Sequence, residues 1–227
     1  KTLQKFLSFS PCPEKLIKIK PSRSWKIIKE ARKKHRLLTF GLELTKKCNL
    51  KCIYCYSNAG APAEDELSLK ETLDAIKQAF KLGARKFGIV GGGEPLLYPY
   101  LFEVIEFIKK LGANVSVYTN ATLVTKEIAR ELFKRKVSVI AKCNSLRPEV
   151  QDELCGIKGT FERIQKGIEN LKAAGYPSPE AHLIIETVIC KQNINELPNL
   201  WRWIRNQGAI PFSVSYTHLT LPTNREV

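Results

Sequence analysis

Methionine is missing from all 227 residues, even at position 1, so we expect the sequence to be a fragment of a longer reading frame. It contains no run of about 18 apolar residues, which argues against a membrane-spanning helix, and no secretory signal peptide is visible. The number of cysteines, seven, is odd, which argues weakly against a framework in which every cysteine is paired in a disulfide. These features predict a cytoplasmic protein in a reducing compartment.

Acidic residues are scarce at the start of the chain. Residues 1–36 hold twelve Lys/Arg against two Asp/Glu, so this segment carries +10 of the total net charge of +15. Such a basic N-terminal extension could contact nucleic acid, an acidic partner or a membrane surface. We favour a simpler interpretation, in which an amphipathic helix over about residues 22–35 packs on the folded core.

Three cysteines lie close together in the sequence, at positions i, i+4 and i+7. Cys48, Cys52 and Cys55 follow the apolar run 37–44, which is typical of a strand, so we expect them on the loop that leaves it. Three thiolates on one loop suit an iron–sulfur cluster, with one iron left open for a ligand that is not protein. The spacing also fits one stripe of a buried helix, or a zinc site that lacks a nearby fourth ligand.

From residue 37 onward the hydrophobic pattern alternates between strand and helix. Strands are predicted over residues 38–44, 86–90, 114–118, 137–142, 182–189 and from 209 to 212. Helices are predicted over residues 68–82, 100–111, 126–135, 148–154, 160–174 and 195–207. This alternation predicts an α/β fold with parallel strands and right-handed crossovers.

The CxxxCxxC spacing of the cysteine loop, with tyrosines on both sides of the last cysteine, resembles the signature of the radical S-adenosylmethionine (SAM) superfamily. A second motif, Gly91–Pro95, resembles the glycine-rich SAM-binding segment of that family. The resemblance covers about residues 37–212 and is nearest to molybdenum-cofactor cyclases and peptide or cofactor maturases. It implies a partial (β/α)6 TIM-like barrel, with its chemistry at the C-terminal ends of the strands.

The resemblance also implies two cofactors. Cys48, Cys52 and Cys55 would hold a [4Fe–4S] cluster, and SAM would bind the open iron. An electron from the cluster would then cleave SAM and release a 5′-deoxyadenosyl radical, which abstracts hydrogen from the substrate. The electron would come from an external donor such as a ferredoxin or a flavodoxin-like protein, and the substrate could be a peptide, a protein or a small molecule.

Further residues are implied as SAM contacts: Tyr54, Gly91, Gly92, Gly93, Glu94, Asn120, Lys142 and Ser145. The glycines would let the backbone approach the ligand and adopt positive φ, and Glu94 would lie near the SAM ammonium group. Tyr54 would contact the adenine largely through its backbone, and it could also be an aromatic packed beside the cluster, because the two roles are compatible. Lys142 departs from the family pattern, because many relatives have a small hydroxyl residue there. An inward lysine at a strand end needs an anionic partner, which could be a carboxylate or phosphate of SAM or substrate. The alternative is a lysine that points away from the barrel.

Two parts of the chain lie outside this assignment. Residues 213–227 resemble the translation of a sequencing adapter, so we expect them to be non-native. Cys12, Cys143, Cys155 and Cys190 are expected to be buried thiols and not ligands. An alternative function, binding and not catalysis, is that of a zinc-stabilised nucleic-acid-binding module. This alternative gives Gly91–Glu94 no role, so nucleic acid is not the favoured partner.

Overall fold

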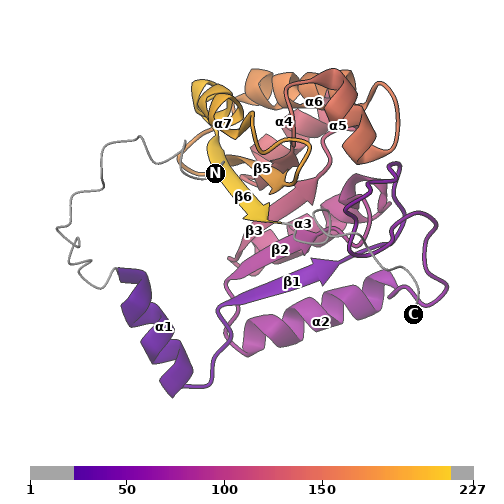
Figure 1. Cartoon of the computed structure of the whole chain (residues 1–227). Helices are drawn as coiled ribbons and strands as arrows, with labels where there is room; N and C mark the ends of the chain where they lie inside the picture. The colour runs from indigo at the N-terminus through magenta and orange to yellow at the C-terminus, as the bar shows by residue number, and fades with distance from the viewer. Residues whose placement is uncertain (1–22, 216–227) are drawn as a thin grey trace, which may run out of the picture.

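The computed structural model describes residues 23–215, which contain one sheet of six parallel strands (Figure 1). The strands lie side by side in chain order: β1 (Thr39–Glu43), β2 (Lys86–Val90), β3 (Asn114–Thr119), β4 (Ser138–Lys142), β5 (Leu183–Ile189) and β6 (Ile210–Ser215). Each strand pairs in parallel with the next. The predicted α/β fold is confirmed, and its open six-stranded sheet is that of a partial (β/α)6 barrel.

Helices connect the strands along the outer side of the sheet (Figure 1). They are α2 (Leu69–Lys81), α3 (Leu101–Lys110), α4 (Lys126–Lys134), α5 (Pro148–Cys155), α6 (Thr160–Ala174) and α7 (Leu197–Asn206). Ser68 and Glu71 cap the start of α2 reciprocally, as the sequence predicts. The short 3₁₀ helix η2 (Pro95–Leu97) was not predicted, and it directly follows the glycine-rich segment.

Alternation along the strands divides the side chains between two faces. Phe87 and Ile89 of β2, like Val115 and Val117 of β3, are buried in the core that the helices cover. Residues at the alternate positions of these strands face the concave side, and two of them, Val90 and Tyr118, line a cavity there. The fold therefore keeps its apolar core outside the sheet and leaves the concave side for ligands.

The N-terminal helix α1 (Arg23–Lys33) stands apart from the sheet in Figure 1. Ile27 is 50% exposed and Ile28 is 37% exposed, while Ala31 is the only buried side chain among residues 26–33. The predicted packing of this helix on the core is therefore wrong, because the helix buries too little apolar surface to hold it there.

Two predicted segments, residues 1–36 and residues 213–227, lie partly outside the described residues. The parts that lie outside are residues 1–22, which include Cys12, and residues 216–227. Strand β6 runs three residues beyond the predicted boundary at 212, to Ser215, which pairs with Ile189. The non-native origin of residues 213–227 stays a prediction. Within residues 23–215, no helix combines the length and apolarity that crossing a bilayer requires.

Candidate active site

A cavity of about 370 Å³ opens at the C-terminal ends of the strands, and Cys48, Cys52 and Cys55 all line it. The thiols of these three cysteines are free and half-buried. The other lining residues predicted from the sequence are Tyr54, Gly91, Gly92, Gly93, Glu94, Asn120 and Lys142. Ser145 is the one predicted site residue that does not line this cavity.

Backbone hydrogen bonds fix the cysteine loop between β1 and α2. The amide of Cys48 donates to Gly60 (2.9 Å), and the amide of Lys51 donates to Cys155 at the end of α5 (3.1 Å). The residues from 44 to 60 contain no helix. The cysteines are therefore loop residues that converge on a cavity, and their interpretation as a stripe of a buried helix is wrong.

The glycine-rich segment lies directly against the start of the cysteine loop. The amide of Gly93 donates to the Thr45 carbonyl (2.7 Å), and the amide of Glu94 donates to the Lys47 carbonyl (2.9 Å). A Cβ at Gly93 would overlap the carbonyl of Lys47. None of Gly91, Gly92 and Gly93 has positive φ, so that part of the prediction is wrong. Glycine is required here because two backbone segments pack closely, which joins the two halves of the site.

Glu94 is a buried carboxylate, 1% exposed, at the centre of this junction. Its oxygens accept hydrogen bonds from the Thr119 hydroxyl (2.7 Å), the Asn120 amide (2.7 Å) and the Leu96 amide (3.1 Å). Burial raises the pKa of Glu94 to about 7. Asn120 in turn donates to Asn49 of the cysteine loop (2.9 Å). Glu94 and Asn120 therefore tie the ends of β2 and β3 to the cysteine loop.

Lys142 has an anionic partner, but that partner is a residue of this chain. Its Nζ lies 2.5 Å from Oε2 of Glu186, and both side chains line the cavity. The two residues are neighbours in the register of β4 and β5. The anionic partner that an inward lysine needs is therefore present within the chain, as Glu186.

Ser145 and Tyr54 are both held by other parts of the chain. The Ser145 hydroxyl donates to Glu196 (2.5 Å), so Ser145 stabilises the connection from β4 to α5 and does not face the ligand cavity. The Tyr54 ring is buried, and its hydroxyl accepts a hydrogen bond from Asn144 (2.7 Å). Burial raises the pKa of Tyr54, so its phenol stays neutral. Tyr54 is therefore a packed aromatic in the wall of the cavity, a role that is compatible with a backbone contact to SAM.

Tyr56 and Ser57 are among the lining residues that sequence reasoning did not assign to the site. The Tyr56 hydroxyl lies 2.7 Å from the Gly91 carbonyl, and the Ser57 hydroxyl donates to the Gly92 carbonyl. Both follow Cys55 directly, so their closeness to the cysteine motif was the available signal. They provide a second link between the cysteine loop and the glycine-rich segment.

The family model described as the radical SAM superfamily matches residues 42–204. The chain belongs to the radical SAM superfamily. Members of this superfamily use a [4Fe–4S] cluster and SAM, and the cavity is lined by the kinds of groups that both would need. Three free thiols of one loop meet the backbone of the glycine-rich segment there. Within residues 23–215, no three His, Cys, Asp or Glu side chains gather as they would around a single metal ion, and this holds for Cys48, Cys52 and Cys55 as well.

Curated relatives share about a third of the aligned residues. An AdoMet-dependent heme synthase from Methanosarcina barkeri is 32% identical over 186 residues, which are 81% of this chain and 50% of that protein. The subtilosin biosynthesis protein AlbA from Bacillus subtilis is 31% identical over 176 residues, 77% of this chain and 38% of that protein. The chain therefore spans about half the length, or less, of these relatives.

A solved structure supports the same fold. The crystal structure of SuiB from Streptococcus suis bound to S-adenosylmethionine has a TM-score of 0.69 and 22% sequence identity. The match covers 84% of this chain and 44% of SuiB. At this identity the likeness shows the fold alone, and it agrees with the open parallel sheet described above.

Proposed function

We propose that this chain is the core of a radical SAM enzyme that cleaves SAM reductively. When bound, the [4Fe–4S] cluster supplies the electron that converts SAM to a 5′-deoxyadenosyl radical, which abstracts hydrogen from the substrate. The observation that carries the proposal is the single cavity shared by the three loop cysteines and Gly91–Glu94. Cys48, Cys52 and Cys55 would hold the cluster as thiolates.

The remaining polar groups of the cavity suit a zwitterionic ligand such as SAM. Glu94 would offer negative charge toward an ammonium group once it has lost its proton, and Lys142 would offer positive charge toward a carboxylate. Asn120 and the backbone beside Tyr54 complete the proposed SAM contacts. Ser145 is left out of this set because its hydroxyl is held by Glu196 outside the cavity.

We further propose that the substrate is a peptide, a protein or a cofactor precursor. Support comes from the names of the relatives, which include a subtilosin biosynthesis protein, a mycofactocin maturase and a heme synthase. Reduction of the cluster requires an external one-electron donor, for which a ferredoxin or flavodoxin-like protein is suited. The six free cysteines among the described residues favour a reducing compartment such as the cytoplasm.

The test is cluster assembly followed by SAM cleavage under anaerobic conditions. Reconstituted protein should bind about four irons and produce 5′-deoxyadenosine when it is reduced in the presence of SAM. The Cys52→Ala variant should lose both properties. The matched control is Cys190→Ala, because Cys190 is 2% exposed and does not line the cavity, so this variant should keep both.

Iron content is the primary measurement, because the chain spans only about half of its relatives. Wild-type protein that binds one zinc per chain, takes up no iron and cleaves no SAM would refute the proposal. Loss of iron in Cys190→Ala to the same extent as in Cys52→Ala would also contradict it, because any buried cysteine would then matter equally.

A further inference from the structure

The proposed function gives the N-terminal helix α1 no role. Its charged and apolar side chains are exposed, since Ala31 is the only buried side chain between residues 26 and 37. Residues 26–36 hold six Lys/Arg against one Glu. None of these side chains forms an ion pair within the part of the chain that the structure describes. The helix therefore presents positive charge that no neighbouring carboxylate neutralises.

The two kinds of side chain lie on different sides of α1. At about 100° per residue, Lys26, Lys29 and Lys33 fall on one side of the helix. Ile27 and Ile28 fall on the opposite side. The apolar side of such a helix normally packs on a core, but here the two isoleucines stay 50% and 37% exposed. The apolar side therefore suits a partner other than the sheet.

The C-terminal turn of α1 joins the helix to the folded core. His35 has φ of +50°, and the amide of Arg36 donates to the Ala31 carbonyl (2.9 Å), which is the left-handed turn that commonly ends a helix. The amide of Leu37 then donates to the Leu82 carbonyl just beyond α2 (3.0 Å). The helix is therefore held beside the end of the sheet at which the strands begin, as Figure 1 shows.

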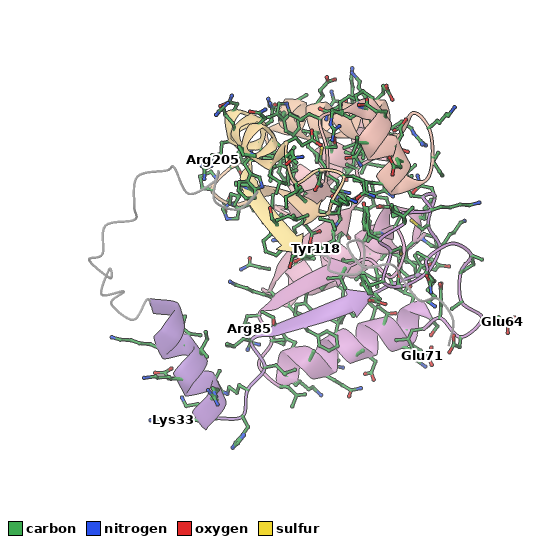
Figure 2. All side chains as sticks on the ribbon, in the orientation of Figure 1. Lys33, Glu64, Glu71, Arg85, Tyr118 and Arg205 are labelled. Atoms are coloured by element: carbon green, nitrogen blue, oxygen red, sulfur yellow. The ribbon has the colours of Figure 1, made fainter. Side chains whose placement is uncertain are left out.

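The end of the sheet beside α1 is also basic. Helices that follow parallel strands run back to the end at which the strands begin, so their last turns gather there. These last turns carry Lys81 of α2, Lys109 and Lys110 of α3, Lys134 of α4, Lys172 of α6 and Arg205 of α7. Figure 2 shows Lys33, Arg85 and Arg205 toward the left side of the molecule and Glu64 and Glu71 toward the right. Each last-turn cation compensates its own helix dipole, but together with α1 these cations make one end of the molecule basic.

Anionic lipid fits this combination better than nucleic acid does. Binding to the phosphates of nucleic acid requires positive charge, and it gives Ile27 and Ile28 no role. A helix at a membrane surface uses both features, because its apolar side enters the headgroup region while its basic side attracts anionic lipid. Each Lys or Arg near the surface adds to that attraction. Exposed isoleucines on a basic helix therefore indicate lipid.

We propose that α1 docks this protein reversibly on an anionic lipid surface. Ile27 and Ile28 enter the headgroup region, and Lys26, Lys29 and Lys33 attract the anionic headgroups. The basic end of the sheet faces the same surface. The cavity with the loop cysteines lies at the other end of the strands and faces away from the lipid. The inference goes beyond the proposed function, and it uses none of the residues that line that cavity.

Vesicle sedimentation with the whole chain tests the proposal. Wild type should bind vesicles of equal parts phosphatidylcholine and phosphatidylglycerol, should not bind vesicles of phosphatidylcholine alone, and should bind less as the salt concentration rises. The double variant Ile27→Gln/Ile28→Gln keeps the charge and the helix propensity, and it should lower the partition coefficient about tenfold. The double variant Lys29→Ala/Lys33→Ala should lower it by about the same factor, because two cations are lost.

Matched variants away from α1 separate docking by this helix from the general attraction of a chain with net charge +15. Lys70→Ala/Lys158→Ala removes two exposed lysines, one at the start of α2 and one in the turn before α6. Leu67→Gln removes an apolar side chain that is 55% exposed. Both controls should bind anionic vesicles as tightly as wild type. All the substituted positions are exposed, and an unchanged midpoint of urea unfolding checks that each variant is folded.

Wild-type protein that does not bind the anionic vesicles would overturn the proposal. Equal binding by wild type and Ile27→Gln/Ile28→Gln would also overturn it, because the apolar side of α1 would then stay out of the lipid. Equal losses in the α1 variants and in the controls would do the same, since net charge alone would attract the chain. Binding to duplex DNA without binding to vesicles would make nucleic acid the partner of α1 instead.

Discussion

The two ends of the sheet carry cavities of different character. At the C-terminal ends of the strands lies the cavity of about 370 Å³ with the three loop cysteines. At the N-terminal ends lies a larger one of about 630 Å³, whose lining includes Lys86, Lys109 and Lys136. Tyr118, labelled on the sheet in Figure 2, lines both cavities and separates them together with Ile140.

The difference lies in how firmly each end holds its polar groups. At the C-terminal end, Glu94 is buried and accepts three hydrogen bonds, and Lys142 and Glu186 are only 25% and 12% exposed. At the N-terminal end, the ion pair Lys136–Glu180 is 55% and 64% exposed. The volume of a cavity therefore does not identify the candidate site here. Desolvated polar groups in fixed positions identify it, because such groups bind a charged ligand without further reorganisation.

The largest effect on stability should come from Gly93→Ala. The added methyl group would overlap the Lys47 carbonyl, a backbone atom that cannot rotate away. We expect the free energy of unfolding to fall by about 3 kcal/mol, since relief requires the glycine-rich segment to move off the cysteine loop. Urea denaturation at one pH measures the change.

Gly41→Ala in β1 is the matched control. A Cβ at Gly41 finds no atom within 4 Å, so the free energy of unfolding should change by about 0.5 kcal/mol or less. If both variants lose the same stability, the close contact between the two loops is not what requires glycine at position 93.

The pH dependence of stability gives a second test at the same end. The ordinary pKa of a glutamate is 4.5, and burial raises that of Glu94 to about 7. Between these values the folded state holds a proton that the unfolded state has lost, so stability falls as pH rises through this window. Relative to Glu94→Gln, which cannot ionise, wild type should lose about 2 kcal/mol between pH 5 and pH 8. Urea titrations of both proteins at several pH values measure it, and parallel profiles would contradict the burial of an ionisable Glu94.

Local sequence patterns predict the elements of this fold well, but they do not predict which side chains meet. The capping pair Ser68 and Glu71, and the turns at strand ends, depend on neighbours in the sequence, so they were predicted correctly. Lys142 meets Glu186 only because β4 and β5 pair in one register, and a one-residue shift would separate them. Cys155 meets Lys51 only through the packing of α5 on the cysteine loop. Contacts of this kind depend on tertiary structure, which a single sequence does not display.

The smallest effect should come from separating Lys142 and Glu186. Lys142→Met leaves Glu186 mostly buried without its cation, and we expect the free energy of unfolding to fall by about 1.5 kcal/mol. The loss is smaller than for a fully buried pair because the cavity admits water to the lysine. A double-mutant cycle with Glu186→Gln isolates the pair, and its coupling free energy should exceed about 1 kcal/mol.

The same cycle at the other end of the sheet completes the comparison. Lys136→Met and Glu180→Gln alter an ion pair whose charges are exposed and screened, so the coupling free energy should be below about 0.5 kcal/mol. Raising the salt concentration should weaken this pair further and change the Lys142–Glu186 coupling less. Equal couplings at both ends would mean that the C-terminal cavity does not desolvate its charges. The C-terminal end of the sheet would then hold its charged groups no more firmly than the N-terminal end, whatever the cysteines bind.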